Sequence, residues 1–224
     1  MISPGDNIVI IGDSWGCGEW LNSSKVVHTG LEYFLSEYGC NVVNLAVGAS
    51  SNSIQICNLL NYLKDNDNTD SIDCIIWFQT DPIRDLGPYN QEFFPQSVSE
   101  LVEAGKKLLE KSYKKLNNIG ITVYCLGGVA KLEDSINNYP NLVPVIPSII
   151  EMFGGVQPEY WVGAWVDTVK LRDEFLTELE SVPPLKSLED WANLLPRQWF
   201  YPDGSHPNRD AHYKIFQHII NQHK

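Results

Sequence analysis

The stretch Asn7–Gly16 reads NIVIIGDSWG and holds both the first strand signal and the first chemically suggestive residue. Its β-branched run, Asn7–Ile11, ends at Gly12, and the continuous apolarity predicts a short strand buried on both faces. In an open parallel sheet, ligands bind at the carboxyl ends of the strands, where Ser14 would lie. A serine there can be a nucleophile if a base lies near, although Asp and Ser also form ordinary turns and helix caps.

Outward from this stretch, apolar runs alternate with amphipathic segments. Three more buried strands and a fifth, proline-containing one are predicted at Asn41–Val47, Ile72–Phe78, Ile121–Leu126 and Leu142–Ile146. Helices are predicted at Val26–Tyr38, Ser53–Leu63, Ser97–Asn118 and Pro207–His223, the last with Pro207 in its first turn. Strands that alternate with helices imply an α/β fold with a central parallel sheet and helices on both faces.

The chain length predicts a single domain, 1–224, with an irregular inserted subregion around 128–200. Short helices are expected within this subregion at Asp167–Glu180 and Leu185–Leu195. Four tryptophans of the subregion either pack it onto the core or line a substrate cleft: Trp161, Trp165, Trp191 and Trp199.

Composition restricts the classes of partner. The chain has 16 Lys and Arg against 28 Asp and Glu, a net charge of −12, which disfavours nucleic acid and anionic membranes as partners. Its five cysteines form no C-x-x-C pair, and Cys74 and Cys125 lie in apolar runs, which favours a reduced chain. No signal peptide or membrane-spanning run is recognised, so a cytoplasmic location is expected.

Near the other end, the sequence Y-P-D-G-S-H-P-N places Asp203 and His206 three residues apart on a loop before the last helix. A histidine can serve as a general base when a carboxylate holds its ring in one tautomer. Gly204 lets the loop bend so that both side chains face one point. The alternative is a turn-and-cap motif with a surface histidine.

Taken together, G-D-S after the first strand and D-x-x-H-P before the last helix resemble the SGNH (GDSL-type) hydrolase family. The resemblance implies a flavodoxin-like three-layer α/β/α sandwich. It also implies that Ser14 is the nucleophile, His206 the base and Asp203 its orienting acid. The block Asn44–Asn52 resembles the family's second motif, which implies that Gly48, or the adjacent Ala49, donates a backbone N–H to an oxyanion hole together with the N–H of Ser14.

The family's third block is G-x-N-D after a strand, and this chain departs from it with Gln79-Thr80-Asp81. Either Thr80 or Asp81 stands at the position of the usual oxyanion-hole asparagine. Three outcomes follow: Thr80 donates, Asp81 is protonated or turned away, or the hole is impaired. Arg84 either neutralises Asp81 or is an ordinary surface or substrate-contacting arginine.

The remaining candidate residues are interpreted as structural, surface or pocket-lining residues. Asp13 is expected to bond nearby backbone, and His212 and His218 are expected to face solvent on the last helix. Cys17 and Glu19, close after Ser14, are candidates for lining the pocket. The histidines outside the proposed triad have no matching set of metal ligands, so no metal and no organic cofactor is expected.

These patterns predict a serine esterase that hydrolyses a small-molecule or carbohydrate ester through an acyl-enzyme, with an acylated carbohydrate favoured. Two alternatives stay open. One is a catalytically impaired carbohydrate-binding or structural protein with the same fold, and the other is an acyltransferase. The sequence does not predict an oligomeric state.

Overall fold

The structure is a computed structural model, and it describes residues 2–21, 25–66, 71–86, 98–156, 196–200 and 206–221. The two helices expected at Asp167–Glu180 and Leu185–Leu195 lie outside these residues, as do Asp203 and three of the four tryptophans of the predicted inserted subregion. Among the described residues, no helix is long and apolar enough to cross a membrane.

The core of the fold is a five-stranded parallel sheet with the strand order β4-β1-β5-β6-β7. Its strands are β1 (Asn7–Ile11), β4 (Asn41–Asn44), β5 (Cys74–Gln79), β6 (Val123–Gly127) and β7 (Leu142–Ile146). All five predicted strands are therefore confirmed. The second is shorter than predicted, because its ladder with β1 ends at the pair Ile10 and Asn44.

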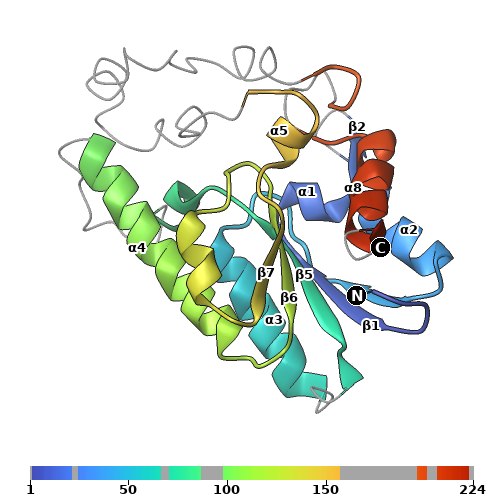
Figure 1. The fold of residues 1–224 in the computed structure, drawn as a ribbon, viewed down its shortest axis with the longest axis horizontal. Coiled ribbons are helices and arrows are strands. Elements are labelled where there is room, and N and C mark those ends of the chain that lie inside the picture. Colours follow the sequence, from blue (N-terminus) through green and yellow to red (C-terminus); the bar gives the residue numbers. More distant parts are fainter. Residues whose placement is uncertain are drawn as a thin grey trace.

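Helices cover both faces of the sheet (Figure 1). The covering helices are α2 (Leu31–Glu37) and α8 (Arg209–Asn221) on one face, and α3 (Asn52–Asn66) and α4 (Val98–Asn117) on the other. Because side chains alternate along a strand, Ile8 and Ile10 of β1 pack with the first pair of helices and Val9 and Ile11 with the second. The predicted three-layer α/β/α sandwich is thus confirmed.

The predicted helix at Val26–Tyr38 is wrong over its first third. Lys25–His28 forms strand β3, which pairs antiparallel with β2 (Glu19–Leu21) in a two-stranded hairpin, and α2 begins only at Leu31. Two consecutive β-branched residues suit the strand. Gly30 then separates strand from helix with a φ of 57°, and a Cβ on it would lie 2.8 Å from ring atoms of His212.

The last helix also begins later than predicted. Pro207 precedes α8 and forms an isolated antiparallel bridge with Phe200. Asn208 caps the helix instead, because its side-chain oxygen accepts a hydrogen bond from the N–H of Ala211 at 2.9 Å. The bridge brings the two ends of the segment 200–207 together, and this segment carries His206.

Four short helical segments complete the described chain: α1 (Ser14–Cys17), η2 (Pro82–Leu86), η3 (Asp134–Asn138) and α5 (Ile149–Met152). None of the five cysteines is in a disulfide. Cys74 and Cys125 are buried, as their apolar surroundings predicted.

Candidate active site

Three loops meet at the carboxyl edge of the sheet, because β1 lies between β4 and β5 in the strand order. The chain crosses from β1 to β4 on one side and later returns to β5 on the other, so this edge is the topological switch point at which open α/β sheets bind ligands. Gly12 ends β1 here, and a Cβ on it would lie 2.8 Å from that of Phe78 on β5. The turn that carries Ser14 therefore needs a glycine in order to approach β5.

Asp13 fixes the turn after β1. One oxygen of its carboxylate accepts a hydrogen bond from the N–H of Trp15 at 3.0 Å and so caps α1, at whose first position the half-buried Ser14 stands. The expected bond from Asp13 to nearby backbone is confirmed. Its second oxygen has further partners that the sequence did not indicate.

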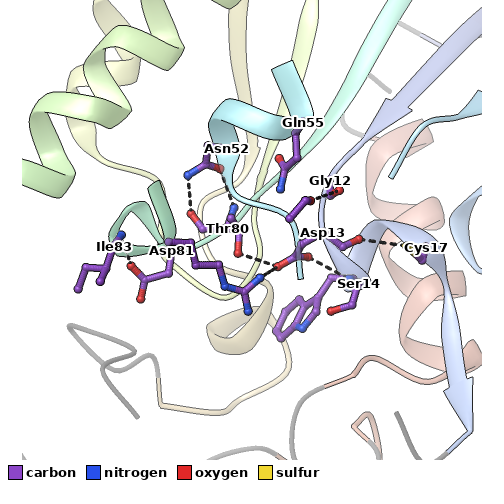
Figure 2. Close-up of polar contacts among 12 residues, drawn as sticks. Gly12, Asp13, Ser14, Cys17, Asn52, Gln55, Thr80, Asp81 and Ile83 are labelled. Atoms are coloured by element: carbon purple, nitrogen blue, oxygen red, sulfur yellow. Dashed lines mark hydrogen bonds and ion pairs between the residues drawn. The ribbon is translucent and has the colours of Figure 1, made fainter. Parts of the chain in front are cut away.

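That second oxygen accepts from the hydroxyl of Thr80 at 2.7 Å and from Nη1 of Arg84 at 2.8 Å (Figure 2). Both members of the ion pair are buried, with side chains 7% exposed for Arg84 and 1% for Asp13. The expectation of Arg84 as a surface residue is therefore wrong. It lies beneath the site because the 3-10 turn that follows β5 directs it toward the turn that follows β1.

The three side chains of the divergent third block all have partners within the protein. Gln79 accepts from the Tyr113 hydroxyl at 2.7 Å, toward the α4 side of the sheet. Thr80 donates its hydroxyl to Asp13, and its backbone N–H and C=O both bond to the buried side chain of Asn52. Asp81 accepts from the N–H of Ile83 at 2.8 Å, which caps the following turn (Figure 2).

The loop after β4 carries Gly48, which is exposed, and Ala49, which has a φ of 60°. This loop is held against the turn that carries Ser14, because the hydroxyl of Ser50 donates to the carbonyl of Gly12 at 3.0 Å. Cys17 lies close to this loop. Burial and the neighbouring Asp13 raise the pKa of its thiol to about 12, and a hydrogen bond with the Gly48 backbone opposes this rise. Cys17 is therefore protonated at neutral pH and does not compete as a nucleophile.

His206 lies at the same edge, 8% exposed, and stacks on the indole of Trp20 with ring centroids 5.3 Å apart and an interplanar angle of 30°. The indole N–H of Trp20 donates to the backbone carbonyl of Ser14 at 2.7 Å. One side chain thus contacts both proposed reacting residues. Sequence reasoning missed Trp20, because nothing marks it except its position six residues after Ser14.

The histidines of α8 are placed differently from the prediction. His212 is fully buried, and burial lowers its pKa to about 4, although the Gly18 backbone favours the charged form somewhat. Nε2 of His218 lies 3.3 Å from the carbonyl oxygen of Val145. Both were expected to face solvent, and this was wrong for His212, whose ring lies against Gly30. His218 is exposed, as expected. Glu19 of the β2–β3 hairpin is buried and pairs with Arg209.

A metal site would need a cluster of His, Cys, Asp or Glu side chains. Within the part of the chain that the structure describes, no group of three or more such residues could hold a metal ion.

No protein-family model and no curated protein matches this chain. Among solved structures, TesA matches with 14% identity, 96% of each chain covered and a TM-score of 0.45. The esterase EstA from Pseudoalteromonas sp. matches with 13% identity, 96% of this chain and 95% of that chain covered and a TM-score of 0.46. A mutant of Axe2, an acetylxylan esterase from Geobacillus stearothermophilus, matches with 13% identity, coverage of 98% and 94%, and a TM-score of 0.43.

Proposed function

We propose that this chain is an SGNH (GDSL-type) serine hydrolase that cleaves an ester through an acyl-enzyme. One observation supports this above all: Ser14 and His206, from opposite ends of the chain, contact the same indole at the carboxyl edge of the sheet. A nucleophile and a base must be neighbours for nucleophilic catalysis, and this shared contact brings their residues together.

In the proposed reaction, His206 takes the proton of the Ser14 hydroxyl while the oxygen attacks the ester carbonyl. Asp203 holds the imidazole in the required tautomer. The collapsing intermediate releases the alcohol, which receives the proton from His206, and leaves the acyl group on Ser14. Water then attacks in the same manner, so the carboxylic acid leaves and the serine is restored.

The oxyanion that forms in each half-reaction is proposed to bind the backbone N–H groups of Ser14 and Gly48. Thr80 and Asp81 are the candidates for a third donor. Thr80 has to release Asp13, because its hydroxyl has a single hydrogen, whereas Asp81 has to be protonated and can then donate from one oxygen while the other still accepts from the N–H of Ile83. A hole with two backbone donors is the simpler arrangement.

The proposed substrate is a neutral ester, and within this class we propose an acylated carbohydrate. The net charge of −12 repels anionic lipids and phosphorylated substrates, whereas it leaves the binding of a neutral sugar ester unaffected. Transfer of the acyl group to a bound sugar hydroxyl is the same chemistry with another acceptor, and the products formed in the presence of added sugar separate the two reactions.

The test uses a serine-reactive fluorophosphonate and p-nitrophenyl acetate with the wild type, Ser14→Ala and Ser36→Ala. Ser36 is an exposed serine on α2 and serves as the matched control. Wild type and control should be labelled and should turn over, and Ser14→Ala should lose the label and roughly a thousandfold or more of the rate. A wild type that is neither labelled nor active refutes the proposed hydrolase and favours a binding protein, and activity retained in Ser14→Ala refutes the nucleophile.

A further inference from the structure

Trp20 contacts all three parts of the proposed catalytic apparatus for which the structure gives geometry. Its ring stacks on His206, and its N–H bonds the carbonyl of Ser14. The far edge of the ring lies against Gly48, since a Cβ on this glycine would be 3.3 Å from Cη2 of the indole. One side chain therefore contacts the proposed base, the turn that carries Ser14 and the proposed oxyanion-hole glycine. The reaction proposed above assigns no role to this side chain.

The backbone of Trp20 is itself fixed relative to the base. The preceding residue, Glu19, pairs with Nε of Arg209 at 3.1 Å, which joins β2 to the first residue of α8. Gly18 makes the turn from α1 into β2 with a φ of 119°. A Cβ on Gly18 would overlap the carbonyl oxygen of His28 and the backbone of Thr29. The hairpin thus links the segment that begins at Ser14 to the helix that follows His206.

A stacked aromatic ring can assist a catalytic histidine in two ways. It limits the tilt of the imidazole, and misplacement of a reacting group by about 1 Å costs on the order of a hundredfold in rate. Its electron-rich face also favours the imidazolium that forms when the base takes the serine proton. Both effects act on the transition state, so they change kcat more than KM.

We infer that Trp20 is a positioning residue for the reaction proposed above: its indole face orients the imidazole of His206 toward Ser14, while its N–H holds the indole on the nucleophile turn. The inference rests on the proposed hydrolase function. Trp20 therefore has a role in the reaction in addition to its place in the β2–β3 hairpin.

The experiment compares the wild type with Trp20→Leu and Trp20→Met, which lack a flat face, and with Trp20→Phe, which keeps the face but has no N–H. Leu21→Ala is the control, because Leu21 follows on the same strand and is 50% exposed. The substrates are p-nitrophenyl acetate, whose leaving group departs without a proton, and ethyl acetate, whose alkoxide must be protonated by His206.

Trp20→Leu and Trp20→Met, which lack an aromatic ring, should lose about 10- to 100-fold in kcat on p-nitrophenyl acetate, and their KM should change less than about threefold. Their loss on ethyl acetate should be at least about fivefold larger, because a misplaced histidine fails both as base and as acid. Trp20→Phe should recover kcat to within about fivefold of the wild type, and Leu21→Ala should match the wild type.

This dependence on the leaving group separates positioning from folding, since a smaller folded fraction lowers both rates equally. Equal losses on the two esters, or wild-type rates in Trp20→Leu, overturn the inference while the hydrolase stands. If Trp20→Leu does not fold, Trp20→Met, which keeps more of the volume, decides the question by the same comparison. An inactive wild type overturns the proposed function and the inference together.

Discussion

Removing Arg84 should destabilise the protein and disturb the turn that carries Ser14. Arg84 pairs with Asp13 at 2.8 Å, and both side chains are withdrawn from solvent. In Arg84→Met, the carboxylate of Asp13 stays buried with two of its three partners, the hydroxyl of Thr80 and the N–H of Trp15. The change therefore leaves a buried charge that is only partly compensated.

The size of the effect follows from this arrangement. Breaking a buried ion pair by removing one member costs about 3–5 kcal/mol of unfolding free energy. Because Asp13 keeps two hydrogen bonds, we expect a loss near the lower end, about 3 kcal/mol. For a domain of this size, that corresponds to a fall of roughly 6–12 °C in Tm.

A double-mutant cycle measured by urea denaturation tests the reasoning. Asp13→Asn keeps the shape of the side chain but turns an N–H donor toward Arg84 or Thr80, so it should also destabilise the protein. The double variant should be less destabilised than the sum of the single variants by at least about 1 kcal/mol, because neither charge is then left alone. Lys107→Met removes a cation from an exposed pair with Glu103 and should cost no more than about 0.5 kcal/mol. Strict additivity, or an Arg84→Met variant as stable as the Lys107 control, would refute the buried-pair account.

Other predictions concern pH, thiols and a turn. Burial lowers the pKa of His212 to about 4 from its ordinary 6.5, so its contribution to stability is complete above pH 6.5 and is lost as pH falls toward 4. As the pH is lowered from 6.5 to 4, the unfolding free energy of His212→Met should therefore fall by less than that of the wild type, by up to about 3 kcal/mol. An equal fall in both proteins, measured by urea denaturation at each pH, would contradict this. Cys57 is the one exposed thiol of the five, so a thiol reagent should rapidly modify one cysteine in the native protein and none in Cys57→Ser; rapid labelling of more than one would contradict the burial. Gly18→Ala should lose at least about 2 kcal/mol by urea denaturation, because of its φ of 119° and the overlap with His28, and an unchanged midpoint would refute the strain.

Local patterns were enough to predict the strands and the main helices. Continuous apolar runs such as Ile8–Ile11 are buried whichever sheet they join, and alternation of strands with helices leaves few topologies open. The first third of the segment Val26–Tyr38 was predicted wrongly because apolar spacing suits a helix there. Its conformation is decided by a partner strand, Glu19–Leu21, which shows no strand pattern of its own.

The sequence by itself determined the α/β class and the position of Ser14 directly after β1, because both depend on periodicity and on glycine within a few residues. Only the tertiary structure decided which charges and rings meet beneath and beside Ser14. Arg84 was left open between a partner of Asp81 and a surface or substrate-contacting residue, and it pairs with Asp13. Trp20 carried no motif, and its ring stacks on that of His206. Contacts of this kind join residues from separate loops, and their partners are set by how the sheet edge and the hairpin pack rather than by spacing along the chain.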